Sequence, residues 1–197
     1  MIELFISLTI KLFFLLTPFF VLSVFLSMTE EMDVPAQRKL ALRVVLSVMV
    51  ISLVLYFGGN TIFSTLGITL DGFRIGTGSL LFLSAVSLVS GKRARPEPED
   101  DGDIAVVPLA MPITVGPATI GTLLILGAEL ENTTDKLVGA VALVAACCCV
   151  GALLFSASAI KKIIGRTGLA MLTKITGLVL SALAAQIVFT GVRNFLT

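Results

Sequence analysis

Histidine and tryptophan are absent from this 197-residue sequence, and tyrosine occurs once. The three cysteines are consecutive, Cys147, Cys148 and Cys149, so they lack the spacing of a metal site or a disulfide framework. We interpret them as small packing residues. All 13 acidic residues lie at the ends of apolar runs or between them, which leaves no nucleophile–base pair or metal cluster within a run. The chain is therefore not expected to be an enzyme, and its net charge of +1 does not predict nucleic-acid binding.

Apolar residues dominate what is present. They make up 56% of the chain, only 14% of residues are charged, and the mean hydropathy is +1.05. These values predict an all-α, polytopic membrane protein, since a span needs about 20 apolar residues. The N-terminal run is too long for a signal-peptide core, so we expect it to remain as the first span. Six runs have spanning length: Leu4–Met28, Leu42–Leu66, Phe73–Ser90, Ile104–Gly127, Leu137–Ile160 and Leu169–Phe195.

One polar, proline-containing stretch, residues 91–103, divides the runs into two groups of three. The sequence thus predicts a single transmembrane domain with a first three-helix repeat (1–90), a cytoplasmic linker (91–103) and a second three-helix repeat (104–197). An odd number of spans per half makes the two repeats inverted. By the positive-inside rule, both termini lie outside the cytoplasm. The rule rests on the basic residues expected in the loops after spans one, three and five: Arg38, Lys39, Arg43, Lys92, Arg93, Arg95, Lys161, Lys162 and Arg166.

A weak sequence similarity supports duplication. In the first half, Pro18 precedes Arg74 by 56 residues, and in the second half Pro117 precedes Lys174 by 57. Each basic residue is followed by isoleucine and small residues.

The fourth run contains the strongest candidate for a binding site. Pro112 and Pro117 each remove a helix hydrogen bond, and Gly116 allows the backbone to leave helical geometry. The freed backbone groups, with the hydroxyls of Thr114 and Thr119, are able to hold a zwitterion or a partly dehydrated cation. The alternative is a packing kink, but a broken membrane helix normally faces protein or a wet cavity.

The first run offers a weaker counterpart at Thr17 and Pro18, with Ser23 as the nearest following hydroxyl. A single proline followed by bulky phenylalanines need not unwind a helix. We assign these three residues to the substrate site because matched breaks in the two halves are typical of transporters with a midplane site.

Charged residues near the span ends are candidates for a supporting role. Arg74 and Lys174 need partners or must extend to the membrane interface, because a central charge costs at least about 2.5 kcal/mol. Capping of freed carbonyls or snorkelling is the favoured role, and binding of a substrate carboxylate is the alternative. Asp71, beside Arg74, is the candidate carrier if transport is proton-coupled. Lys11 is interpreted as a snorkelling residue, and Gln186 as ordinary polar packing between helices.

Three strings resemble the MarC family of bacterial and archaeal membrane proteins: VPLAMPITVGPATI (107–120), FRIGTG (73–78) and LTKITGL (172–178). The resemblance covers nearly the whole chain. The family's first-span pattern, Asn-Pro-x-Gly-x-x-Pro, is altered here to Thr17 and Pro18 with Phe20 and Ser23, and its Gly-Pro-Gly is Gly-Pro-Ala at residues 116–118.

The resemblance implies six transmembrane helices in two inverted repeats, with helices 1 and 4 broken, and secondary transport of small neutral amino acids such as glycine and alanine. No cofactor is expected, although H⁺ or Na⁺ is open as a coupling ion. The expected partners are the lipid bilayer of the cell (inner) membrane and a small-molecule substrate, and a homo-oligomer is open. Two alternatives remain: an efflux permease for another small metabolite, or a non-transporting structural membrane protein.

Overall fold

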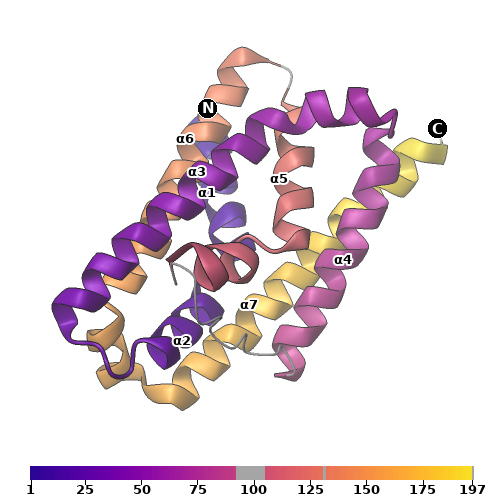
Figure 1. Ribbon diagram of the computed structural model, residues 1–197. Helices are drawn as coiled ribbons and strands as arrows, with labels where there is room; N and C mark the ends of the chain where they lie inside the picture. Colours follow the sequence, from indigo (N-terminus) through magenta and orange to yellow (C-terminus); the bar gives the residue numbers. More distant parts are fainter. Residues whose placement is uncertain (92–104, 131, 197) are drawn as a thin grey trace.

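The computed structural model describes residues 1–91, 105–130 and 132–196, and within these residues it is entirely helical (Figure 1). The predicted linker, apart from Gly91, lies outside the described residues, as does the side chain of Pro112. The elements in order are α1 (Ile2–Leu15), α2 (Pro18–Met28), α3 (Val34–Leu66), α4 (Leu70–Ser90), η1 (Ala105–Thr114), α5 (Pro117–Glu129), α6 (Thr133–Phe155) and α7 (Ala157–Leu196).

Capping residues explain why α3 is longer than the apolar run that predicted it. The side chain of Asp33 accepts a hydrogen bond from Ala36 N at 3.1 Å, so the helix begins at Val34 rather than near Leu42. It ends at Gly67, whose φ of 65° is left-handed. The basic residues expected in loops therefore lie within helices, a correction that applies to Arg38, Lys39 and Arg43 in α3 and to Lys161, Lys162 and Arg166 in α7.

The last two predicted runs also differ from the observed helices. The fifth run was expected to reach Ile160, but α6 ends at Phe155 and a turn at Ser156 separates it from α7. Within α7, Gly165 has φ 68° and ψ 176°, a conformation that glycine alone adopts readily. The residues before Gly165 thus form a short separate helical segment in front of the long final helix.

Among the described residues, four helical segments are long and apolar enough to cross a membrane: residues 34–59 of α3, then α4, α6 and α7. The pair α1 and α2 makes a fifth span if it is counted as one helix bent by 41°. The shorter apolar helix α5 has 13 residues. Many large apolar side chains are exposed on the outside of the bundle, including Leu42, Val54 and Phe189, as expected for a surface that faces lipid.

The most extensive helix pairing joins α4 to α7, which lie side by side along the molecule (Figure 1). Their backbones approach closely at Gly78, where an added Cβ would lie 2.6 Å from Val188 Cγ2 and 3.1 Å from Ala184 O. Small residues at such crossings are typical of packed membrane helices. The shorter helices flank this pair, since α5 packs against α4 and α2 packs against α7.

The two ends of the bundle differ in their polar contacts. Both chain termini lie at one end, and the turn from α2 to α3 and the junction of α6 with α7 lie at the other (Figure 1). At this second end Glu30 pairs with Lys161 at 3.2 Å and with Arg166 at 2.8 Å. These ion pairs tie the α2–α3 turn to the start of α7.

Candidate functional site

The first helix break lies at Thr17, between α1 and α2. Thr17 has φ 48° and ψ 54°, a left-handed conformation that is rare for a β-branched residue. Pro18 then starts α2, a position where its missing N–H is not needed. The Thr17 side chain is buried, and its hydroxyl has no hydrogen-bond partner among the described residues. The helix is therefore broken although Phe20 and Ser23 replace the glycine and proline of the family pattern.

The second break lies at Gly116, between η1 and α5. The helix before it is a π-helix, in which Val115 N donates to Ala110 O at 2.9 Å and Thr114 Oγ1 donates to Leu109 O at 2.7 Å. Gly116 is extended, with φ −83° and ψ 175°. Wide turns of this kind occur frequently at functional sites.

The two breaks meet inside the bundle. Thr119 Oγ1, in the first turn of α5, donates a long hydrogen bond of 3.5 Å to Leu15 O, a backbone carbonyl at the end of α1. Thr119 and Thr114 are both buried. Pro117, by contrast, is exposed and does not face the interior. The contact connects residues 104 positions apart in the chain and brings the predicted breaks together.

Two predicted site residues lie away from this contact. Ser23 is half-buried and lines a separate small pocket with Lys161 and Arg166. Lys174 is exposed on α7. Neither lines the pocket that adjoins the breaks.

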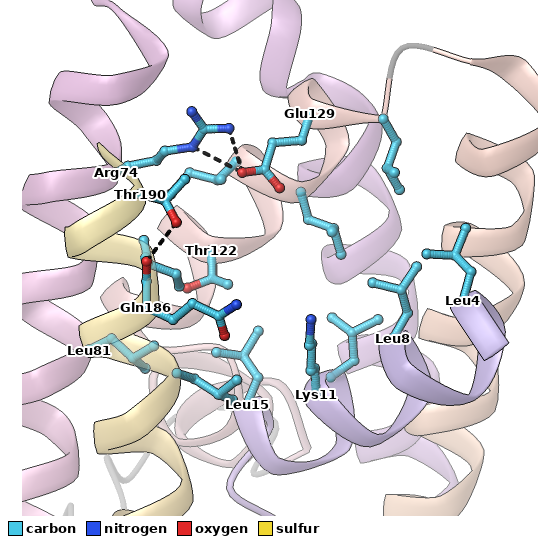
Figure 2. A pocket seen from close by; sticks show the side chains of 16 residues that line it. Leu4, Leu8, Lys11, Leu15, Arg74, Leu81, Thr122, Glu129, Gln186 and Thr190 are labelled. Carbon is cyan, nitrogen blue, oxygen red and sulfur yellow. Dashed lines mark hydrogen bonds and ion pairs between the residues drawn. The ribbon is translucent and has the colours of Figure 1, made fainter. Parts of the chain in front are cut away.

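A pocket of about 350 Å³ opens between α1, α4, α5 and α7 and reaches Leu15 at the first break (Figure 2). Its walls are mainly leucine and isoleucine, and a few polar side chains project from different helices. This composition is typical of small-molecule sites. The lining residues with polar side chains are Lys11, Arg74, Thr122, Glu129, Gln186 and Thr190.

Arg74 is held at the edge of this pocket by two carboxylates. Its Nε and Nη2 donate to Glu129 Oε1 at 2.9 and 2.6 Å, and its Nη1 donates to Asp71 Oδ1. The guanidinium has several donors in a rigid plane, so it can bind both carboxylates at once. Asn194 Nδ2 also contacts Asp71 Oδ1, at 3.4 Å. Ion pairing to carboxylates, rather than capping of carbonyls, thus accounts for the charge of Arg74.

Sequence reasoning missed three features of this pocket. Glu129 ends α5 beyond the predicted fourth run, and its partner Arg74 lies 55 residues earlier. Lys11 and Gln186, interpreted as a snorkelling residue and as polar packing, both line the pocket. One signal was available: the start of span three and the end of span four lie on the same side of the predicted membrane, where Arg74 needed a partner.

No group of three or more His, Cys, Asp and Glu residues able to hold a metal ion occurs within the described residues. Cys147 is buried in α6, whereas Cys148 and Cys149 are exposed on it.

Comparison with known proteins identifies the family. The model of the MarC family of integral membrane proteins matches residues 2–196. The chain belongs to the MarC family. It is 34% identical to the UPF0056 membrane protein YhcE of Escherichia coli K12, over 94% of this chain and 90% of that protein. It is 32% identical to the UPF0056 membrane protein MJ1677 of Methanocaldococcus jannaschii, over 94% of each chain.

A further MarC relative is the UPF0056 inner membrane protein YhgN of Escherichia coli K12, at 28% identity over 97% of each chain. No solved structure matches the chain. Together with the apolar helices, the family match makes this chain a multi-pass membrane protein.

Proposed function

We propose that this MarC protein is a secondary transporter of small neutral amino acids such as glycine and alanine, with alternating access around the two helix breaks. The observation that carries the proposal is the pocket of about 350 Å³ that reaches the first break, where Thr119 meets Leu15. Broken helices expose backbone groups that lipid cannot satisfy, so they persist where a cavity or protein faces them. Paired broken helices build the substrate sites of several transporter folds.

The volume of the pocket and its lining suit a small, mostly apolar solute. Pockets for small molecules span about 300 to 1,000 Å³, so this one lies at the small end of that range. Apolar walls fit the side chain of alanine better than that of a charged amino acid. The few polar groups fit a solute with a charged or polar head.

An inverted repeat of two three-helix halves is part of the proposal, and a symmetric contact supports it. At Gly177 an added Cβ would lie 2.8 Å from Val89 Cγ2 and 2.9 Å from Ala85 O. The contacts around Gly78 and Gly177 involve the same residue types, and corresponding residues are 99 positions apart. Gly177 corresponds to Gly78, Val89 to Val188 and Ala85 to Ala184. Pro18 and Pro117, the first residues of α2 and α5, have the same separation.

In this arrangement the halves contain six spans: α1 with α2, α3 and α4, then η1 with α5, α6 and α7. The reciprocal packing of α5 on α4 and of α2 on α7 is what a two-fold relation between halves requires. The same relation equates Arg74 with Thr173, one position before Lys174. The two basic residues are therefore not equivalent, which agrees with the exposure of Lys174.

We also propose that both termini lie outside the cytoplasm. Arg38, Lys161 and Arg166 are brought to one end of the bundle, since Arg38 lies 4.7 Å from the ring of Phe155 and the other two pair with Glu30. A cluster of basic residues at one end favours a cytoplasmic position for that end. The pocket beside Arg74 then opens toward the outside.

The test is uptake of radiolabelled glycine and alanine into proteoliposomes under an imposed proton gradient and, separately, a sodium gradient. Gly116→Leu places a large side chain in the second break and should abolish uptake. Gly76→Leu is the matched control, because Gly76 is exposed on α4 with nothing near its Cβ position. The proposal fails if wild-type protein takes up neither amino acid under either gradient while a reconstituted relative does.

A further inference from the structure

A lysine without a partner among the described residues faces the pocket. Lys11 projects from α1 into it (Figure 2), and it makes no ion pair or hydrogen bond with the described residues. Lys11 lies nine residues into α1, which is about 13 Å along the helix at 1.5 Å per residue. A charged residue within an apolar helix of a membrane protein is a functional candidate by default. The Lys11 side chain is exposed, so it is accessible to a ligand in the pocket.

A carboxylate faces the same pocket from another helix. Both hydrogen bonds from Arg74 end on Glu129 Oε1, and the second oxygen of Glu129 points toward the pocket (Figure 2). Arg74 also fixes the position of this carboxylate, because Nε and Nη2 donate to it together. Glu129 is thus a preorganised acceptor with one oxygen still available to a ligand.

The charges around the pocket form two separate groups of opposite sign. Arg74 with Asp71 and Glu129 carries a net charge of −1, and Lys11 carries +1. The two groups come from helices on different sides of the pocket, α4 and α5 for the first and α1 for the second. A solute with an anionic end and a cationic end would match both groups at once.

We propose that the pocket binds the zwitterionic head of an amino acid, with the α-carboxylate on the Lys11 ammonium and the α-ammonium on Glu129. Gln186 and Thr122 also line the pocket (Figure 2) and supply further polar contacts to the head. Leu8, Leu12 and Leu81 line the wall and receive a small apolar side chain. This inference rests on the proposed function and names the groups that would select its substrate class.

The apolar wall and the paired charges predict which solutes are rejected. An amine without a carboxylate leaves Lys11 unpaired, and a carboxylic acid without an amine leaves Glu129 unpaired. Hydrogen bonds to charged groups are worth about 1.5 to 3 kcal/mol, which corresponds to roughly ten- to a hundredfold in affinity. Alanine should therefore bind at least about tenfold more tightly than ethylamine or propionate.

The test is binding of alanine, ethylamine and propionate to the purified full-length protein by isothermal titration calorimetry. Lys11→Met should weaken alanine binding about tenfold or more and leave ethylamine binding unchanged. Glu129→Gln should weaken alanine binding similarly and leave propionate binding unchanged. Lys39→Met is the matched control for the first variant, since Lys39 is exposed near the start of α3. Glu31→Gln is the control for the second, since Glu31 is exposed in the turn between α2 and α3 and does not line the pocket.

The outcomes separate this inference from the proposed function. Alanine uptake that is unchanged in both pocket variants would overturn the zwitterion site and leave the transporter standing. Binding of alanine that depends on Lys11 and Glu129, without uptake under any gradient, would support the site and remove the transporter. Equal binding of alanine, ethylamine and propionate to the wild type, or binding of none of them, would overturn the site.

Discussion

Glu129, the last residue of α5, accepts two hydrogen bonds from the guanidinium of Arg74, a residue of α4 that lies 55 positions earlier. The contact joins the two halves of the chain at the edge of the pocket. Asp71, one turn before Arg74, completes the cluster. Removal of the arginine would leave two carboxylates without their shared partner.

Replacement of Arg74 by leucine should therefore destabilise the protein more than Glu129→Gln does. For a buried pair the loss of one partner costs about 3 to 5 kcal/mol, and partial exposure of Glu129 and Asp71 lowers this to about 2 to 3 kcal/mol. Arg74→Lys keeps the charge without the planar donors and should lose about 1 kcal/mol. The measurement is the apparent melting temperature in detergent. Equal melting temperatures for Arg74→Leu and wild type would contradict the role given to this cluster.

Alanine in place of Gly127 should prevent normal packing of α3 against α5. A Cβ at this position would lie 1.7 Å from Tyr56 O, a backbone atom that cannot move without displacing α3. The loss should reach about 3 kcal/mol or more, at the upper end for overpacked cores. Gly76→Ala, with open space at its Cβ position, is the control and should be neutral. The measurement for both variants is the fraction of monodisperse protein after detergent extraction. A Gly127→Ala protein as monodisperse as wild type would contradict this packing of α3 against α5.

Alanine in place of Gly78 and alanine in place of Gly177 should destabilise the protein by similar amounts, about 1 to 3 kcal/mol each. The reason is that each added methyl group meets a valine side chain and a backbone carbonyl across the α4–α7 interface. Apparent melting temperatures of the two variants provide the comparison. A large loss from one variant and none from the other would argue against a two-fold relation between the halves.

Relief of the left-handed conformation at Thr17 should raise stability. Glycine adopts φ near 48° without the steric penalty of a β-branched residue, and asparagine tolerates it better than threonine. Thr17→Gly should stabilise the protein by about 0.5 to 1 kcal/mol, and it removes the unpartnered threonine hydroxyl. Thr17→Asn relieves the same strain but places an amide at this buried position, so it should gain less. The measurement is the apparent melting temperature of each variant. Thr173→Gly is the control, because Thr173 lies inside a helix and glycine there should lower the melting temperature. A lower melting temperature for both Thr17 variants would contradict the expected strain.

The ion pairs of Glu30 should make one contact sensitive to acid. The hydrogen bond from Lys161, with the positive charges of Lys161 and Arg166, lowers the pKa of Glu30 from its ordinary value of 4.5. Because the pKa of Glu30 is lower in the folded protein than in the unfolded chain, its ionised carboxylate stabilises the fold at pH values above the unfolded-state pKa. This stabilisation is lost as the pH falls through the folded-state pKa. Glu30→Gln should therefore melt slightly below wild type at pH 7, and the difference should shrink below pH 4.5. A difference that grows on acidification would contradict this assignment.

Much of the helical arrangement follows from local sequence, because long apolar runs and caps such as Asp33 act within a few residues. The turn at Ser156 was missed since residues 137–160 contain no proline to interrupt the apolar pattern. The two helix breaks were predicted from Pro18 and from Gly116 with Pro117, whose effect on the backbone is also local.

The pocket was much harder to predict. Lys11 and Glu129 each resemble an ordinary charge near a span end when considered alone. Their significance depends on which helices pack together, and no local pattern records that α1 and α5 enclose one cavity. The same holds for Arg74, whose need for a partner was evident although the partner was not.

Gly165 changes the direction of α7 before the long final helix, and Glu30 contacts both sides of this joint. Lys161 precedes this glycine and Arg166 follows it, yet both bind the same Glu30 carboxylate. The Glu30 carboxylate therefore bridges the two helical segments that Gly165 joins. The surface residue Glu30 therefore holds both sides of the joint at Gly165, beyond which residues 166–196 of α7 enter the bundle.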